Sequence, residues 1–140
     1  MFRLQRRNKT GINQLMNGGY MGILKIKRIY EPESPDDGYR ILVDRLWPRG
    51  ESKLKADLDE WAKQAAPSSE ERKQFHQGNE SFEQFKEAYL SELNQSEDAR
   101  ELKKEIMEKL NQENVTLLYG SKNKNENNAI VLMEWLKAAS

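Results

Sequence analysis

The feature that most constrains the fold of this chain is a short apolar run with very different sequences before and after it. Residues 39–43 read Tyr-Arg-Ile-Leu-Val, and this apolar, β-branched run predicts a strand. The preceding segment, Pro35 to Gly38, predicts a turn, because proline presets φ and glycine accepts a positive φ. The following segment, 44–50, reads Asp-Arg-Leu-Trp-Pro-Arg-Gly. A strand that only built a core would not need to end in two guanidinium groups, a carboxylate and an indole, so we take this end of the strand as the candidate functional centre.

Hydrophobic periodicity predicts the other elements. Residues 23–30 alternate apolar with basic side chains and predict a first strand, and Val115 to Tyr119 predict a third. Apolar stripes at helical spacing predict about five helices, several of which begin at a capping serine. These helices are expected at residues 52–66, 68–78, 80–93, 96–110 and 129–136.

This order of elements predicts one α/β domain at residues 21–140, with a small, partly parallel (mixed) sheet of about three strands covered by about five helices. Few residues separate the first two strands. That pair is therefore either antiparallel or joined by a short crossover without a helix. Residues 1–20 carry four basic side chains and no acidic one, and we expect a flexible N-terminal extension there.

Composition excludes several classes of protein. The chain has no cysteine and one histidine, which excludes disulfides, thiolate catalysis and the usual zinc ligand sets, so no metal site is predicted. No apolar run approaches the roughly 20 residues that span a bilayer, so no membrane association is expected. The formal net charge of zero argues against general nucleic-acid binding by residues 21–140. We expect a cytoplasmic protein; the sequence indicates neither a cofactor nor an oligomeric state.

The candidate site follows from the topology. If the second and third strands are parallel, their carboxyl ends meet at one edge, beyond which ligands of open α/β sheets bind. The N-terminus of the last helix would add free N–H groups there, and arginine suits phosphate or carboxylate. The sequence therefore predicts a site for a small anion, with Asp44 as the candidate catalytic residue. The candidate ligand-binding residues are Arg40, Arg45, Trp47, Arg49, Ser121, Lys122 and Asn127.

Several of these residues also have a structural interpretation. Asp44 is a general base, an orienting group for an arginine, or half of a structural ion pair with Arg45 or Arg49. Trp47 is a packing anchor or a wall of the pocket, and Asn127 is a helix cap or a ligand contact. His76 is interpreted as a surface residue.

Two functions remain open at this point. The first is binding of a small phosphate or carboxylate compound, with or without its turnover. The second is a non-enzymatic interaction or regulatory module, associated with nucleic acid in one version, that uses the Trp-Pro-Arg-Gly loop as its contact surface, because tryptophan and arginine are favoured interface anchors. The sequence does not decide whether the protein is an enzyme.

Several motifs together carry a family resemblance. They are Arg28-Ile29-Tyr30, Asp37-Gly38-Tyr39-Arg40, Val43-Asp44-Arg45-Leu46-Trp47-Pro48-Arg49-Gly50, Ala66-Pro67-Ser68, Thr116-Leu117-Leu118-Tyr119, and Asn127 followed by Ala129 and Leu132. With these motifs, residues 24–138 resemble the YeaO-like bacterial family. The resemblance implies a cytosolic α/β protein and brings no activity with it. More distant relatives carry a cysteine-containing segment after the last strand, where this chain has Gly120-Ser121-Lys122. A thiolate mechanism of the rhodanese or phosphatase type therefore does not apply.

Overall fold

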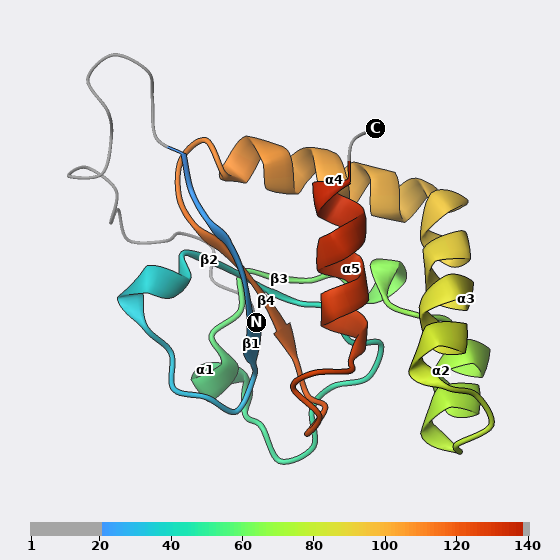
Figure 1. Cartoon of the computed structure of the whole chain (residues 1–140). Coiled ribbons are helices and arrows are strands. Elements are labelled where there is room, and N and C mark those ends of the chain that lie inside the picture. Colours follow the sequence, from blue (N-terminus) through green and yellow to red (C-terminus); the bar gives the residue numbers. More distant parts are fainter. Residues whose placement is uncertain (1–20, 139–140) are drawn as a thin grey trace.

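A parallel sheet of four strands forms the centre of the fold in the computed structural model, which describes residues 21–138 (Figure 1). The strands are β1 (Leu24–Arg28), β2 (Tyr39–Leu42), β3 (Glu60–Trp61) and β4 (Val115–Tyr119). They are arranged in the order β1-β4-β2-β3, and all three pairings between neighbours are parallel. The expected flexible extension, residues 1–20, lies outside the described residues.

The helices complete an α/β domain. They are α1 (Lys53–Ala56), α2 (Ser69–His76), α3 (Phe82–Asn94), α4 (Glu97–Lys109) and α5 (Asn128–Lys137), with 3-10 helices η2 (Pro35–Asp37) and η3 (Lys63–Ala65). The predicted fold class is confirmed. The sheet differs in detail from the prediction, because it has four strands and every pairing in it is parallel.

The connection between β1 and β2 is the short crossover without an α-helix. Both strands pair with β4 in parallel and lie on opposite sides of it. Residues 29–38, which include only the 3-10 helix η2, lead from the end of β1 back to the start of β2. The capping serine Ser34 accepts a hydrogen bond from the backbone N–H of Asp36, and the side chain of Asp37 completes a capping box.

The single helix predicted over residues 52–66 is wrong. Helix α1 ends at Ala56, and the C-cap residue Asp57 adopts a left-handed conformation with φ of 46°. The chain then pairs with β2 as β3, and the N–H of Ala62 donates to the carbonyl of Leu42 at 2.8 Å. The free edge of β2 presents backbone groups that need partners, and pairing with that edge outweighs the helical spacing of the apolar residues.

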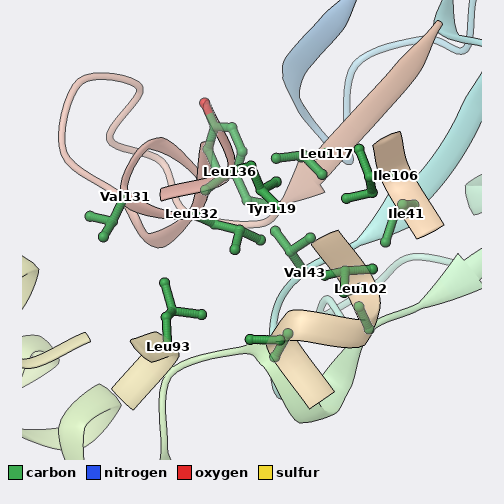
Figure 2. Close-up of a cluster of buried hydrophobic side chains, with 14 of the residues drawn as sticks. Ile41, Val43, Leu93, Leu102, Ile106, Leu117, Tyr119, Val131, Leu132 and Leu136 are labelled. Atoms are coloured by element: carbon green, nitrogen blue, oxygen red, sulfur yellow. The ribbon is translucent and has the colours of Figure 1, made fainter. Parts of the chain in front are cut away.

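The main hydrophobic core lies between the sheet and helices α3, α4 and α5 (Figure 2). Successive side chains of a strand point to opposite faces, so alternate residues of β4 reach this core. Leu117 and Tyr119 pack there with Ile41 of β2 and with Val43, which follows it. The helices supply Leu93, Leu102, Ile106, Val131, Leu132 and Leu136.

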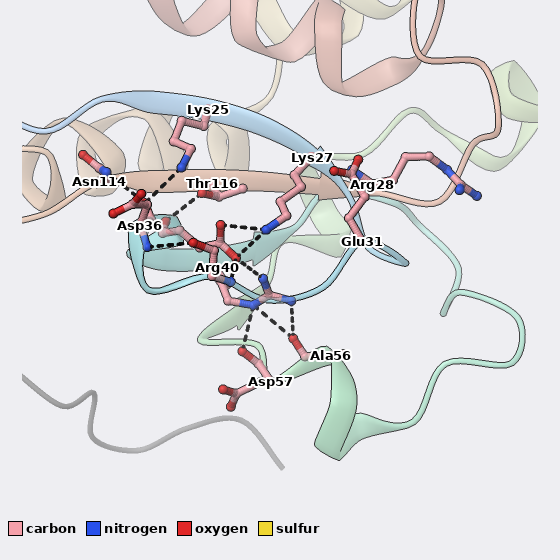
Figure 3. A network of polar contacts seen from close by, with 12 residues as sticks. Lys25, Lys27, Arg28, Glu31, Asp36, Arg40, Ala56, Asp57, Asn114 and Thr116 are labelled. Atoms are coloured by element: carbon pink, nitrogen blue, oxygen red, sulfur yellow. Dashed lines mark hydrogen bonds and ion pairs between the residues drawn. The ribbon is translucent and has the colours of Figure 1, made fainter. Parts of the chain in front are cut away.

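The opposite face of the sheet is covered by a smaller cluster and a polar network (Figure 3). Arg40 is only 1% exposed on this face. Its guanidinium pairs with Asp37 and donates to the carbonyl of Ala56 from Nη2 at 2.7 Å. Lys27 of β1 donates to the same Asp37 at 2.9 Å. The network therefore joins β1, η2, β2 and α1, and it engages Arg40 in the interior of the fold.

A pair of carboxyl groups lies where β3 meets α4. The hydroxyl of Tyr39 lies 3.2 Å from Glu60 Oε1 and 3.2 Å from Glu105 Oε2. Burial, followed by the hydrogen bond and the negative charge of Glu105, raises the pKa of Glu60 to about 7. The folded protein therefore binds a proton at Glu60 more tightly than the unfolded chain does.

Replacing Glu60 with glutamine should therefore stabilise the fold in a pH-dependent way. Because the pKa is raised in the folded state, the stability that the protonated group contributes is present below its unfolded pKa and is lost as the pH rises through about 7. Glutamine stays neutral, so we expect a gain of about 1 kcal/mol at pH 8, a value reduced for solvent screening, and almost none at pH 5.

Urea unfolding at the two pH values measures this difference. The exposed Glu87 on α3 provides the matched control, since Glu87→Gln removes one charge from a different helix and Glu87 is not among the groups that shift the pKa of Glu60. An equal gain from both variants, or the same gain at both pH values, would attribute the effect to overall charge and contradict the account of Glu60.

Candidate functional site

The carboxyl ends of β2 and β4 lie side by side, because these strands are parallel neighbours. The segment 44–50 leaves β2 at this edge. The segment 120–127 leaves β4 at the same edge and leads into the N-terminus of α5 (Figure 1). Two segments that are distant in the sequence are thus brought together where ligands of open α/β sheets bind.

Asp44 connects these segments. Its Oδ2 accepts a hydrogen bond from the N–H of Gly120 at 2.8 Å, and its Oδ1 accepts one from Asn128 Nδ2 at 3.1 Å. Burial raises the pKa of Asp44, although the hydrogen bonds from Asn128 and Gly120 and the nearby side chains of His76 and Arg72 oppose that effect. With both oxygens engaged, Asp44 fixes the end of β2 to the end of β4 and to the start of α5.

A pocket of about 250 Å³ opens beside Asp44. Its walls come from segment 44–49, from residues 120–121, from the start of α5 and from α2. Six of the residues singled out in the sequence line it: Asp44, Arg45, Trp47, Arg49, Ser121 and Asn127. Two others do not. Arg40 belongs to the polar network on the opposite face of the sheet, and Lys122 is an exposed loop residue outside the lining.

Two arginines of the segment after β2 reach the pocket in different ways. Arg45 is half-buried, and its guanidinium donates to the carbonyl of Pro67 from Nε at 2.8 Å and to that of Ala66 from Nη2 at 3.1 Å. These carbonyls hold the guanidinium in place without neutralising its charge. Arg49 is exposed, and its carbonyl accepts a hydrogen bond from the hydroxyl of Tyr30 at 2.7 Å.

Trp47 both packs and lines the pocket. Its ring meets the ring of Trp61 edge-on, with the centroids 5.3 Å apart. Its indole N–H donates to the carbonyl of Glu51 at 2.8 Å, so the polar end of the side chain is already satisfied. These contacts fix the shape of the loop that carries Arg45 and Arg49.

The loop after β4 is held by local hydrogen bonds. Asn127 is 2% exposed and caps α5, with its Oδ1 accepting from the N–H of Ile130 at 3.0 Å. The carbonyl of Ser121 accepts from Arg28 Nε at 2.7 Å, and the hydroxyl of Ser121 accepts from the N–H of Asn123 at 3.1 Å. The N-terminal end of α5 is therefore presented to the pocket by a braced loop.

Helix α2 supplies lining residues that were not assigned to the site from the sequence. Arg72, Phe75 and His76 follow the spacing i, i+3, i+4, which places them on one face of the helix. Arg72 Nε is buried and has no hydrogen-bond partner among residues 21–138. His76 is exposed, as the sequence indicated, but it stands at the pocket. The spacing of these residues in a helix predicted from its cap is the signal that could have identified them.

Within residues 21–138, no group of three or more histidine, cysteine, aspartate or glutamate side chains could hold a metal ion. No helix of this range is long and apolar enough to cross a membrane.

Comparison with known proteins identifies the family. Residues 23–140 match the family model described as the inactive DUF488-N3 subclade. The chain is 46% identical to the uncharacterized protein YeaO of Escherichia coli K12 over 115 residues, which cover 82% of this chain and 97% of that protein. It is 42% identical to the uncharacterized protein Rv3073c of Mycobacterium tuberculosis H37Rv over 81 residues, which cover 58% of this chain and 69% of that protein. No solved structure matches the chain significantly. The chain therefore belongs to the inactive DUF488-N3 subclade and is a member of the YeaO-like family.

Proposed function

We propose that this protein is a cytoplasmic binding domain for a small anion, a phosphate or carboxylate compound held at the carboxyl edge of the sheet. The observation that carries the proposal is the convergence of three arginines, Arg45, Arg49 and Arg72, on one pocket. None of the three forms an ion pair with a carboxylate among residues 21–138. Arg40, by contrast, is paired inside the fold.

Three guanidinium groups against the one carboxylate of Asp44 leave the lining of the pocket with an excess of positive charge, which favours an anionic ligand. The planar fork of arginine matches the oxygens of phosphate and carboxylate, and hydrogen bonds between charged groups are about twice as strong as neutral ones. The buried Nε of Arg72, which has no partner within the described chain, offers one donor for such an oxygen. The N-terminus of α5 adds a partial positive charge at the same pocket.

In this proposal Asp44 is a positioning residue. Its two oxygens accept hydrogen bonds from Gly120 and Asn128, which hold the carboxylate between the loop and the helix. The description of the family as inactive supports binding without turnover.

Replacing Arg72 with glutamine should weaken anion binding at least tenfold, because one of three convergent charges is lost while the length of the side chain is nearly kept. Isothermal titration calorimetry of the full chain with phenyl phosphate, benzoate and inorganic phosphate measures the affinities. A ligand at about 100 times its dissociation constant should also stabilise the fold by roughly 2.7 kcal/mol, which appears as a raised melting temperature.

Arg100→Gln is the matched control, because Arg100 is exposed on α4 and paired with Glu97 away from the pocket. We expect this variant to bind like the parent protein. The proposal fails if none of the three anions binds, or if a folded Arg72→Gln protein binds them as tightly as the parent does. A loss of equal size in both variants would likewise contradict it, because the effect would then reflect overall charge.

A further inference from the structure

The pocket has an apolar floor as well as cationic walls. Phe75 of α2 and Phe85 of α3 both line it, and their rings stack with centroids 4.5 Å apart and an interplanar angle of 19°. Phe85 is only 2% exposed, so this floor belongs to the core and is fixed before any ligand arrives. Pro48 and Pro67 extend the apolar lining. A free inorganic anion would leave these surfaces without a partner.

The size of the pocket permits more than an anionic group. Its volume is about 250 Å³. A cavity of roughly 150 Å³ with apolar walls accepts a benzene ring, and one water molecule occupies about 30 Å³ of liquid. The space therefore accommodates one small ring together with a phosphate or carboxylate group, and it is too small for a dinucleotide.

The cationic and the apolar parts of the lining come close together on α2. Arg72 and Phe75 lie three residues apart, so their side chains are neighbours on one face of the helix, with Cβ atoms about 5–6 Å apart. A ligand that contacts both must carry its charge and its apolar part within a similarly short distance. This condition favours a compact ligand over a long chain with a distant charge.

We propose that the ligand is a small amphiphilic oxyanion, a phosphate or carboxylate directly attached to an aromatic ring or to an apolar group of similar size. The oxyanion would lie among Arg45, Arg49 and Arg72, and the ring would lie on the stacked pair Phe75 and Phe85. This inference rests on the proposed anion binding and specifies its ligand class.

Four probes test this inference separately from the proposed anion binding on which it rests. They are phenyl phosphate, benzoate, inorganic phosphate and the neutral phenol. Calorimetry with the full chain should give at least tenfold tighter binding of phenyl phosphate than of inorganic phosphate, and no measurable binding of phenol. Equal affinity for the two phosphates would overturn the inference and leave anion binding intact. Phenol binding as tightly as phenyl phosphate would overturn anion binding as well. The relative affinities of phenyl phosphate and benzoate assign the anionic group.

Phe75→Ala tests the floor directly. We expect it to reduce the preference for phenyl phosphate over inorganic phosphate at least tenfold, because the ring loses its stacking surface. Phe82→Ala is the matched control: Phe82 also lies against Phe75, with ring centroids 6.0 Å apart, but it does not line the pocket. Thermal melts establish that both variants are folded. If Phe75→Leu, which keeps most of the packing volume, and Phe75→Ala both retain the parent preference, the assigned ring position is wrong.

Discussion

Replacing Arg40 with leucine should lower the free energy of unfolding by about 3–5 kcal/mol, because it breaks a buried ion pair by removing one partner. The guanidinium is 1% exposed and pairs with Asp37, which is equally buried. It also donates to the carbonyl of Ala56 from Nε and Nη2, and to that of Asp57 from Nε. Leucine would leave these acceptors without their donors in the interior of the protein.

The pKa of Asp37 supports the same expectation. Burial alone would raise this pKa, but the hydrogen bonds from Lys27 and from the backbone of Ser34, with the charges of Lys27 and Arg40, lower it overall. A lowered pKa means that Asp37 contributes stability above its unfolded pKa, and that this contribution is lost as the pH falls through the folded one. The loss of stability caused by Arg40→Leu should therefore become smaller at a pH below the folded-state pKa of Asp37, where Asp37 is protonated in both proteins.

Urea unfolding at pH 7 and in acid measures both effects. Arg100→Leu is the control, since Arg100 is exposed and its pair with Glu97 should contribute less than about 1 kcal/mol. A loss below about 1 kcal/mol for Arg40→Leu would mean that water reaches Asp37 and the carbonyls, and would contradict the structural role of the network.

Arg40 also illustrates where sequence reasoning stops. Strand periodicity indicates that Arg40 and Leu42 share a face, and the structure places both on the side covered by α1. Which face of the sheet receives α1 and η2 is decided by how those distant segments pack. Arg45 is of the same residue type but lies beyond the end of the strand, where the topology could be used to predict its position.

For the pocket too, one part of the arrangement could be predicted from the sequence and another part could not. Parallel pairing of β2 with β4 brings segment 44–50 to segment 120–127, a meeting that the sequence predicted only on the condition that these two strands are parallel. The spacing of Arg72, Phe75 and His76 places them on one face of α2, but the direction of that face depends on tertiary packing, including that of Phe75 against Phe85. No local pattern fixes that arrangement. Similarly, residues 60–61 become a strand through pairing with β2, against their helical spacing.

Replacing Gly38 with alanine should cost about 2–5 kcal/mol. Gly38 has φ of 65° and ψ of −129°, a conformation that residues with a side chain rarely adopt. An added Cβ would lie 2.0 Å from the carbonyl oxygen of Asn114, which is backbone and cannot rotate away. Strain in a sparsely populated backbone region costs on the order of 1–3 kcal/mol, and the overlap with packed backbone accounts for the rest.

Gly78→Ala separates the cost of backbone strain from the cost of steric overlap. Gly78 also has a positive φ, 77°, but nothing lies within 4 Å of its added Cβ. We expect this variant to lose about 1–2 kcal/mol of stability, from backbone strain alone. The loss of stability in Gly38→Ala should exceed that in Gly78→Ala by more than steric overlap alone would cause. The N–H of Tyr39 donates to the same Asn114 carbonyl at 2.8 Å, so moving that carbonyl away also breaks the first hydrogen bond between β2 and β4. Equal losses for the two variants in urea unfolding would show that this close approach is not required for the pairing on which the candidate pocket depends.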